Sequence, residues 1–120
     1  MSAAVVTPDP CAQGVPSAVA ELRREAVSAV VRQQQVGEEL AAIRVQACAI
    51  ERRAARALAR GHDLLGRQIL ARGIFTLKAR EALEAELVEC RCQVARLLAT
   101  MVRAEDVAWR ATNPVGSWRK

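Results

Sequence analysis

The sequence is poor in aromatic residues: among 120 residues there are one Phe, two Trp and no Tyr. A compact globular domain of this size usually buries several aromatic rings. A pair of long helices does not need them, because Ala, Leu, Ile and Val suffice along the line of contact between two helices. Apolar residues make up 52% of the chain, so disorder is not expected. The composition therefore favours a thin helical protein.

The sequence also lacks long apolar runs. No stretch reaches eighteen apolar residues, the length expected of a membrane-spanning helix. Residues 1–16 contain neither a basic segment followed by an apolar run nor any other sign of a signal peptide. We therefore expect a cytoplasmic protein whose four cysteines stay reduced.

Groupings of metal-binding or catalytic residues are missing as well. His62 is the only histidine, and no Gly-rich phosphate loop is present. Cys90 and Cys92 form a C-x-C pair, but on a helix their side chains would point about 200° apart. A zinc site needs four convergent ligands. We predict no catalytic, metal-binding or cofactor-binding residues, and hence a protein that is not an enzyme.

What the sequence does contain is a long heptad repeat. Apolar residues recur at alternating steps of three and four from Val19 onward, which is typical of a coiled coil. Gln33 is the only polar residue in this series, and it either fixes the register of the helices or is a tolerated defect. The predicted contact positions, which we call the seam, are Val19, Leu22, Ala26, Ala29, Gln33, Val36, Leu40, Ile43, Ala47, Ile50, Ala54 and Ala57.

The positions of proline, glycine and helix-capping residues predict two long helices. Residues 1–16 contain three prolines and are expected to form a flexible tail, with a first helix over 17–60. Gly61, His62 and Asp63 are expected to form a tight turn, in which Gly61 ends the first helix and Asp63 caps the next. The second helix should cover 64–112 and leave a tail at 113–120. The expected fold is all-α, a long antiparallel two-helix coiled-coil hairpin.

The second helix has a less regular seam. Its expected seam positions near the turn, Leu70, Ile74 and Leu77, do not continue in step into Leu83, which suggests a local stammer. Further along, its apolar stripe is wider than two helices need. A stripe of this width fits a third helix, another subunit or a lipid surface, and we predict self-association. The candidate oligomer interface comprises Leu83, Leu87, Val88, Leu97, Leu98, Met101 and Val102.

Positive charge is concentrated around the turn. Between Arg44 and Arg80 there are nine basic and two acidic residues, a net charge of +7, although the whole chain carries only +5. Such a tip would attract an anionic membrane lipid or an acidic protein, and nucleic acid is a weaker alternative because no DNA-binding motif accompanies the charge. The arginines could equally be merely solvated. The candidate residues for binding an anionic surface are Arg52, Arg53, Arg56, Arg60 and Arg67.

One feature of the expected hairpin is unfavourable. Folding back around His62 would place Glu38 and Glu39 near Glu84 and Glu86, where like charges repel. This leaves open an alternative in which separate chains pair with one another.

Around the turn, the sequence resembles the phage-shock-protein A family. The segment 57–70 is similar to the hairpin region of that family, with Gly61, Asp63, Leu65, Arg67 and Leu70 matching without gaps. His62 replaces the usual Arg, Leu64 replaces an acid and Gly66 replaces Ala. The likeness covers about residues 22–105.

This resemblance implies a helical hairpin related to the ESCRT-III membrane-remodelling superfamily. Members bind stressed bacterial inner membranes, polymerise and restrain a transcriptional activator. They begin with an amphipathic helix, whereas residues 1–16 here are Pro-rich, and they continue past the hairpin. We therefore expect a shortened relative, bacterial and cytoplasmic, that associates peripherally with the inner membrane in envelope stress. The alternative is a coiled-coil adaptor or oligomerisation module with no lipid role, and a third is a basic nucleic-acid-associated protein.

Overall fold

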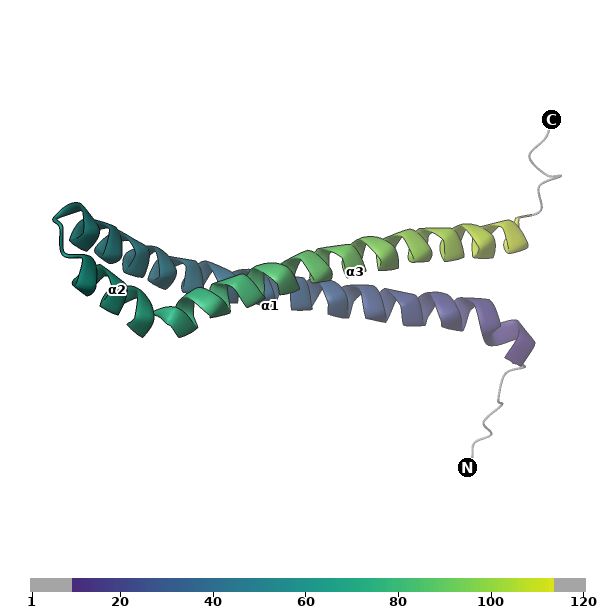
Figure 1. Cartoon of the computed structure of the whole chain (residues 1–120). Helices are drawn as coiled ribbons and strands as arrows, with labels where there is room; N and C mark the ends of the chain where they lie inside the picture. Colours follow the sequence, from purple (N-terminus) through teal and green to yellow (C-terminus); the bar gives the residue numbers. More distant parts are fainter. Residues whose placement is uncertain (1–9, 114–120) are drawn as a thin grey trace, which may run out of the picture. The chain divides into compact units, whose positions relative to one another are not determined.

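The computed structural model describes residues 10–113, with side chains from residue 17 onward. This part of the chain contains three helices and no strand: α1 (Pro10–Ala59), α2 (Asp63–Arg72) and α3 (Ile74–Thr112). Figure 1 shows α1 leading into the turn and α2 and α3 returning from it. The prediction of an all-α helical hairpin is confirmed.

The helix boundaries differ from the sequence expectation by more than one residue at two places. The first helix begins at Pro10 rather than at residue 17, because a proline fits the first helical position, where its missing N–H would have no partner. The second helix is divided at Gly73 into α2 and α3. It ends at Thr112, where Asn113 donates its backbone N–H to the carbonyl oxygen of Trp109 at 2.9 Å. Residues 1–9 and 114–120 of the two expected tails lie outside the described residues.

The chain divides into two compact units. We call residues 31–92 the turn unit, and residues 10–30 together with 93–113 the terminal unit. Each unit contains a segment of α1 and a returning segment, and each is described by itself below.

The heptad prediction for α1 is confirmed. All twelve predicted seam positions are buried or half-buried, and between 17 and 60 the only other residue that is not exposed is Gly37. Val36 and Leu40 are the most enclosed large side chains, at 0% and 1% exposure. In the turn unit they form a core cluster with Leu87 and Cys90 of α3, against which Leu83 packs. Burying an aliphatic side chain of this size contributes about 1.5–3 kcal/mol.

The predicted seam positions near the turn are right at Leu70 and Leu77, which are half-buried, and wrong at Ile74. Ile74, a predicted seam residue, is 39% exposed, whereas Gly66 and Gly73 are buried. An unbroken heptad of buried and half-buried positions also runs from Gly66 into the core cluster. Its members are Gly66, Ile69, Gly73, Thr76, Arg80, Leu83, Leu87 and Cys90.

Two glycines replace apolar residues in this seam because the facing side chains leave no room. A Cβ atom built on Gly66 would lie 2.9 Å from Cδ2 of Leu58, and one built on Gly73 would lie 2.7 Å from Cδ1 of Ile50. At these two positions a side chain of α1 packs directly against the glycine backbone of the returning segment, so no side chain from the returning segment is needed to fill the seam.

The terminal unit has a shallower core. Val19, Ala26 and Ala29 of α1 are buried. The seam residues of α3 in this unit, by contrast, are only half-buried: Val94, Leu97, Met101, Ala104 and Ala108.

The two glutamates of α3 named in the expected repulsion pair with arginines of α1. In the turn unit Glu84 accepts a hydrogen bond from Arg44 at 3.2 Å, and Glu86 pairs with Arg32. The pairing with Glu86 raises the pKa of the Arg32 guanidinium. These exposed ion pairs contribute little to stability, but each places a positive charge beside a glutamate of α3.

Candidate functional site: the basic tip

The turn that closes the hairpin is a Schellman motif. Gly61 has a φ of 79°, in the left-handed region that favours glycine. Its N–H donates to the carbonyl oxygen of Leu58 at 3.0 Å, and the N–H of His62 donates to that of Ala57 at 2.8 Å. These two bonds satisfy carbonyl groups at the end of α1 and reverse the chain within a few residues.

The expected cap at Asp63 is wrong. Asp63 is the first residue of α2, and the preceding His62 holds the N-cap position without a side-chain capping hydrogen bond. The carboxylate of Asp63 still suits this place, because a negative charge in the first turn of a helix opposes the positive end of its dipole. The imidazole of His62 is consequently not engaged in capping.

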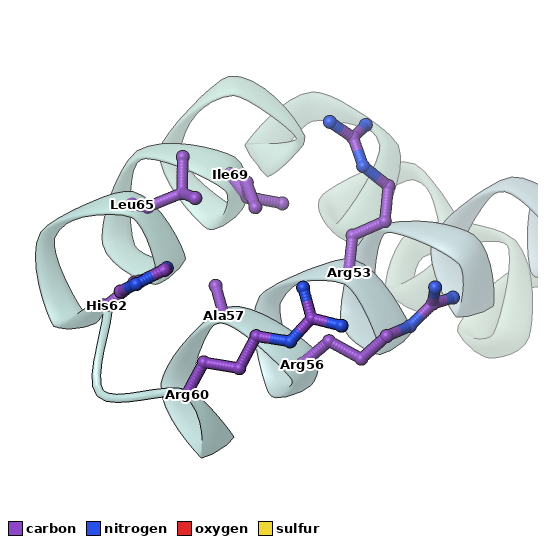
Figure 2. Close-up of a pocket in the computed structure, with 7 residues that line it drawn as sticks. All are labelled: Arg53, Arg56, Ala57, Arg60, His62, Leu65 and Ile69. Carbon is purple, nitrogen blue, oxygen red and sulfur yellow. The ribbon is translucent and has the colours of Figure 1, made fainter.

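A hollow of about 250 Å³ lies beside this turn. One side is formed by three arginines of α1 and the other by the turn and α2, as Figure 2 shows. Ala57 lies between the two sides and has no long side chain to fill the space. The lining residues are Arg53, Arg56, Ala57, Arg60, His62, Leu65 and Ile69.

A second hollow of about 240 Å³ adjoins the first, since Arg53 and Ile69 line both. Arg72 and Gly73 line it from the returning segment, together with Ile50 and Thr76. Arginines from both α1 and α2 therefore border one continuous region of the turn unit that combines guanidinium groups with apolar walls.

The structure brings together three of the five arginines predicted to bind an anionic surface. Arg53, Arg56 and Arg60 are spaced by three and four residues, so they lie along one side of α1 and line the hollow. Arg52 and Arg67 are exposed but do not line either hollow.

Sequence reasoning missed four residues of this region. His62 was assigned only to the turn, Leu65 entered only the family resemblance, Arg72 was counted only in the charge of the tip, and Ile69 was assigned no role. The i, i+4 spacing of Leu65 and Ile69 is the signal that could have placed an apolar wall on α2 facing the arginines.

Four arginines of the described residues pair with a glutamate of another helix, whereas the tip arginines, like Arg24, Arg96 and Arg103, form no ion pair. The four paired arginines are Arg23, Arg32, Arg44 and Arg80. No ion pair within residues 17–113 involves the five candidate arginines. The segment between Arg44 and Arg80 contains two acidic residues, Glu51 and Asp63. Glu51 already accepts hydrogen bonds from Arg80, which leaves Asp63 as the one acidic residue of this segment beside the tip arginines. The tip therefore presents positive charge that the turn unit does not itself neutralise.

The predicted oligomer interface divides into two groups. Leu83 and Leu87 belong to the core of the turn unit, and Leu97 and Met101 are half-buried in the terminal unit. The remaining three are exposed on α3: Val88 at 58%, Leu98 at 41% and Val102 at 61%. Only this second group is available to another molecule without opening the hairpin.

The remaining features considered in the sequence are the cysteines, metal-binding groups and membrane-spanning segments. Cys48 and Cys92 are exposed and Cys90 is buried, all three as free thiols. No cluster of metal-binding side chains occurs within the described residues. In the same part of the chain, no helix is both long and apolar enough to cross a membrane.

Comparisons with known proteins add no relative: no family model, curated protein or solved structure matches the chain.

Proposed function

We propose that this chain is a non-enzymatic helical-hairpin protein that binds anionic membrane surfaces peripherally through its basic tip. The observation that supports the proposal best is the grouping of unpaired arginines around one hollow. Arg53, Arg56 and Arg60 border it together, and none of them has a carboxylate partner in residues 17–113. Arginines held in this way are suited to contact phosphate groups.

The apolar content of the tip favours a lipid surface over an acidic protein or a nucleic acid. Leu65 and Ile69 line the same hollow as the arginines, and Leu64 beside them is 69% exposed. A membrane interface accepts both kinds of group at once, since cations meet the headgroups and apolar side chains enter the acyl boundary.

The resemblance to the phage-shock-protein A family points in the same direction. It supports a role in bacterial envelope stress, with the protein in the cytoplasm and associated peripherally with the inner membrane. We propose this role together with lipid binding, and self-association through α3 as its companion.

The alternative function is a coiled-coil adaptor without a lipid role. It is supported by the exposed apolar group on α3, Val88, Leu98 and Val102, which is suited to helix–helix contact. In that case the arginines at the tip would be solvated and would serve only solubility.

Vesicle co-sedimentation separates these functions. The wild-type chain should sediment with vesicles of phosphatidylglycerol and phosphatidylcholine but not with phosphatidylcholine alone. Binding should weaken with salt, because the Debye length falls from about 10 Å at 0.1 M to about 3 Å at 1 M. Replacing Arg53, Arg56 and Arg60 with Glu should abolish binding, since each arginine near a charged leaflet is worth about 1 kcal/mol.

A charge-matched control distinguishes the tip from net charge. Arg24, Arg96 and Arg103 are exposed residues of the terminal unit and form no ion pair within the described residues. Changing these three to Glu alters the net charge equally and should leave most of the binding intact.

Two results would contradict the proposal. If the tip variant still bound but replacement of Trp109 and Trp118 by Ala removed binding, the membrane site would lie at the C-terminal end of the chain. If the wild type did not bind vesicles at all, the adaptor function would remain, and a duplex-DNA control in the same assay would test the nucleic-acid alternative.

A further inference from the structure

The most exposed large apolar side chain of the described residues lies on the returning segment of the turn unit. Phe75, the only phenylalanine of the chain, is 83% exposed, and Leu64 at the start of α2 is 69% exposed. Neither belongs to the hollows beside the turn. Two large apolar groups in the same unit are therefore left in water.

These two side chains share one face of the returning segment. Leu64 lies two residues before the buried Gly66, and Phe75 lies two residues after the buried Gly73. A separation of two residues corresponds to about 200° around a helix, so each side chain lies on the side away from its buried glycine. The buried residues Gly66 and Gly73 lie on the opposite face. Leu64 and Phe75 thus point away from α1.

The same outer face is basic. Arg67, Arg72 and Lys78 are exposed near Leu64 and Phe75, and the segment 64–80 contains no Asp or Glu. Gln68 and Ala71 fill the face between the two apolar groups and are also exposed. Apolar side chains flanked by arginine and lysine, with no acidic residue among them, are complementary to an anionic lipid interface.

We propose that this face lies flat on an anionic phospholipid surface and inserts Phe75 and Leu64 into the boundary between headgroups and acyl chains. The inference rests on the proposed membrane function and adds to it a means of attachment. Arg67, Arg72 and Lys78 attract the surface, whereas Phe75 and Leu64 supply an apolar contact that salt does not screen. The proposal also orients the protein, with the outer face of α2 toward the membrane.

Tryptophan fluorescence tests the insertion. In a full-length background carrying Trp109→Phe and Trp118→Phe, one variant receives Phe75→Trp and a matched control receives Val45→Trp. Val45 is 72% exposed on α1, so a tryptophan at this position should also be exposed to solvent before vesicles are added. On addition of phosphatidylglycerol vesicles, emission from position 75 should shift to shorter wavelength, and brominated lipid should quench it. Emission from position 45 should not change, and neither indole should respond to phosphatidylcholine alone.

A binding measurement accompanies the spectra. Phe75→Ala should weaken the partition into phosphatidylglycerol vesicles by about tenfold. This is the change expected when a phenylalanine side chain that is only partly buried in lipid is removed. Val45→Ala should leave the partition unchanged. Both positions are exposed, so circular dichroism should show wild-type helicity for every variant.

The outcomes separate the insertion from the proposed function. Co-sedimentation with an unchanged emission at position 75 would overturn the insertion and leave the electrostatic attachment standing. A shift without vesicles that grows with protein concentration would show that a second copy covers this face, and would overturn the lipid contact. A shift at both positions would indicate non-specific burial and count against the proposal. Failure to sediment at all would overturn the proposed function and the insertion together.

Discussion

Arg80 donates two hydrogen bonds of 2.9 Å to Glu51, one from each terminal guanidinium nitrogen to a separate carboxylate oxygen. The fork joins the returning segment to α1 within the turn unit. Arg80 occupies a seam position of the heptad, and 25% of its side chain is exposed, the lowest value among the charged partners of the ion pairs. A charged residue is tolerated there because the aliphatic part of the arginine side chain can cover the seam while its guanidinium group reaches the carboxylate of Glu51.

This pair predicts an acid-dependent loss of stability. The hydrogen bond from Arg80 lowers the pKa of Glu51 below its ordinary value. The folded-state pKa is therefore below the unfolded one, so the contribution to stability is present above the unfolded pKa of about 4.3 and is lost as pH falls through the folded pKa. Urea unfolding of the wild type and of Glu51→Gln should show a difference at neutral pH that disappears in acid.

The matched control for the pH experiment is Glu89→Gln. Glu89 is exposed on α3 and forms no ion pair within the described residues. A difference between the wild type and Glu51→Gln that stayed constant with pH would refute the coupling to Arg80.

Two glycines should respond in opposite directions to the same substitution. A Cβ on Gly37 would meet nothing within 4 Å, so Gly37→Ala should stabilise the hairpin by about 0.5–1 kcal/mol through improved helix propensity. A Cβ on Gly73 would lie 2.7 Å from Cδ1 and 2.8 Å from Cγ2 of Ile50. Because a β-branched side chain cannot easily move aside, Gly73→Ala should destabilise by about 1–3 kcal/mol. Thermal or urea unfolding measures both, and equal signs would argue against the packing described at Gly73.

Gly61 should tolerate substitution poorly for a different reason. No atom crowds the position of its Cβ, but its φ is 79°. Alanine in this conformation costs about 1–2 kcal/mol, and asparagine, which visits the left-handed region more readily, should cost less. Urea unfolding of Gly61→Ala and Gly61→Asn tests this order, and an alanine variant as stable as the wild type would contradict it.

Self-association should depend on the exposed apolar group of α3. Replacing Leu98 and Val102 with Glu should reduce the mass seen in sedimentation equilibrium while helicity is kept, because both side chains are exposed in the hairpin. Leu97→Glu should instead lower the stability of the hairpin, since Leu97 is half-buried in the terminal unit. A wild-type chain that stays monomeric at high concentration would end the self-association hypothesis.

The sequence predicted the fold of α1 well because one strict rule governs it. Apolar residues occupy the seam positions with the single exception of Gln33, so periodicity alone identified the contact face. The returning segment obeys the same heptad with Gly66, Gly73 and Arg80 at seam positions, which an apolar count does not recognise. Ile74 was consequently assigned to the wrong face.

The register between the helices was the second unpredictable feature. Periodicity fixes which face of each helix is buried but not how far one helix slides along the other. The sequence therefore predicted glutamates of the two helices near one another but not the arginine that pairs with Glu86, which is Arg32 in the structure. The concentration of arginine at the tip could be counted from the sequence. The hollow beside it could not, because it depends on Leu65 and Ile69 of α2 facing Arg53 across Ala57.

The two glycines that bracket α2 have a consequence for local unfolding. Between the turn at Gly61 and the break at Gly73 lie ten helical residues whose only buried member is Gly66. A segment with so little buried side chain can open and close without separating the core formed by Val36, Leu40, Leu87 and Cys90. Amide hydrogens of α2 should therefore exchange with solvent well before those around Leu40. If α2 contacts a lipid surface, that contact should keep α2 folded against the rest of the turn unit. Slower amide exchange of α2 in the presence of vesicles would therefore report the contact directly.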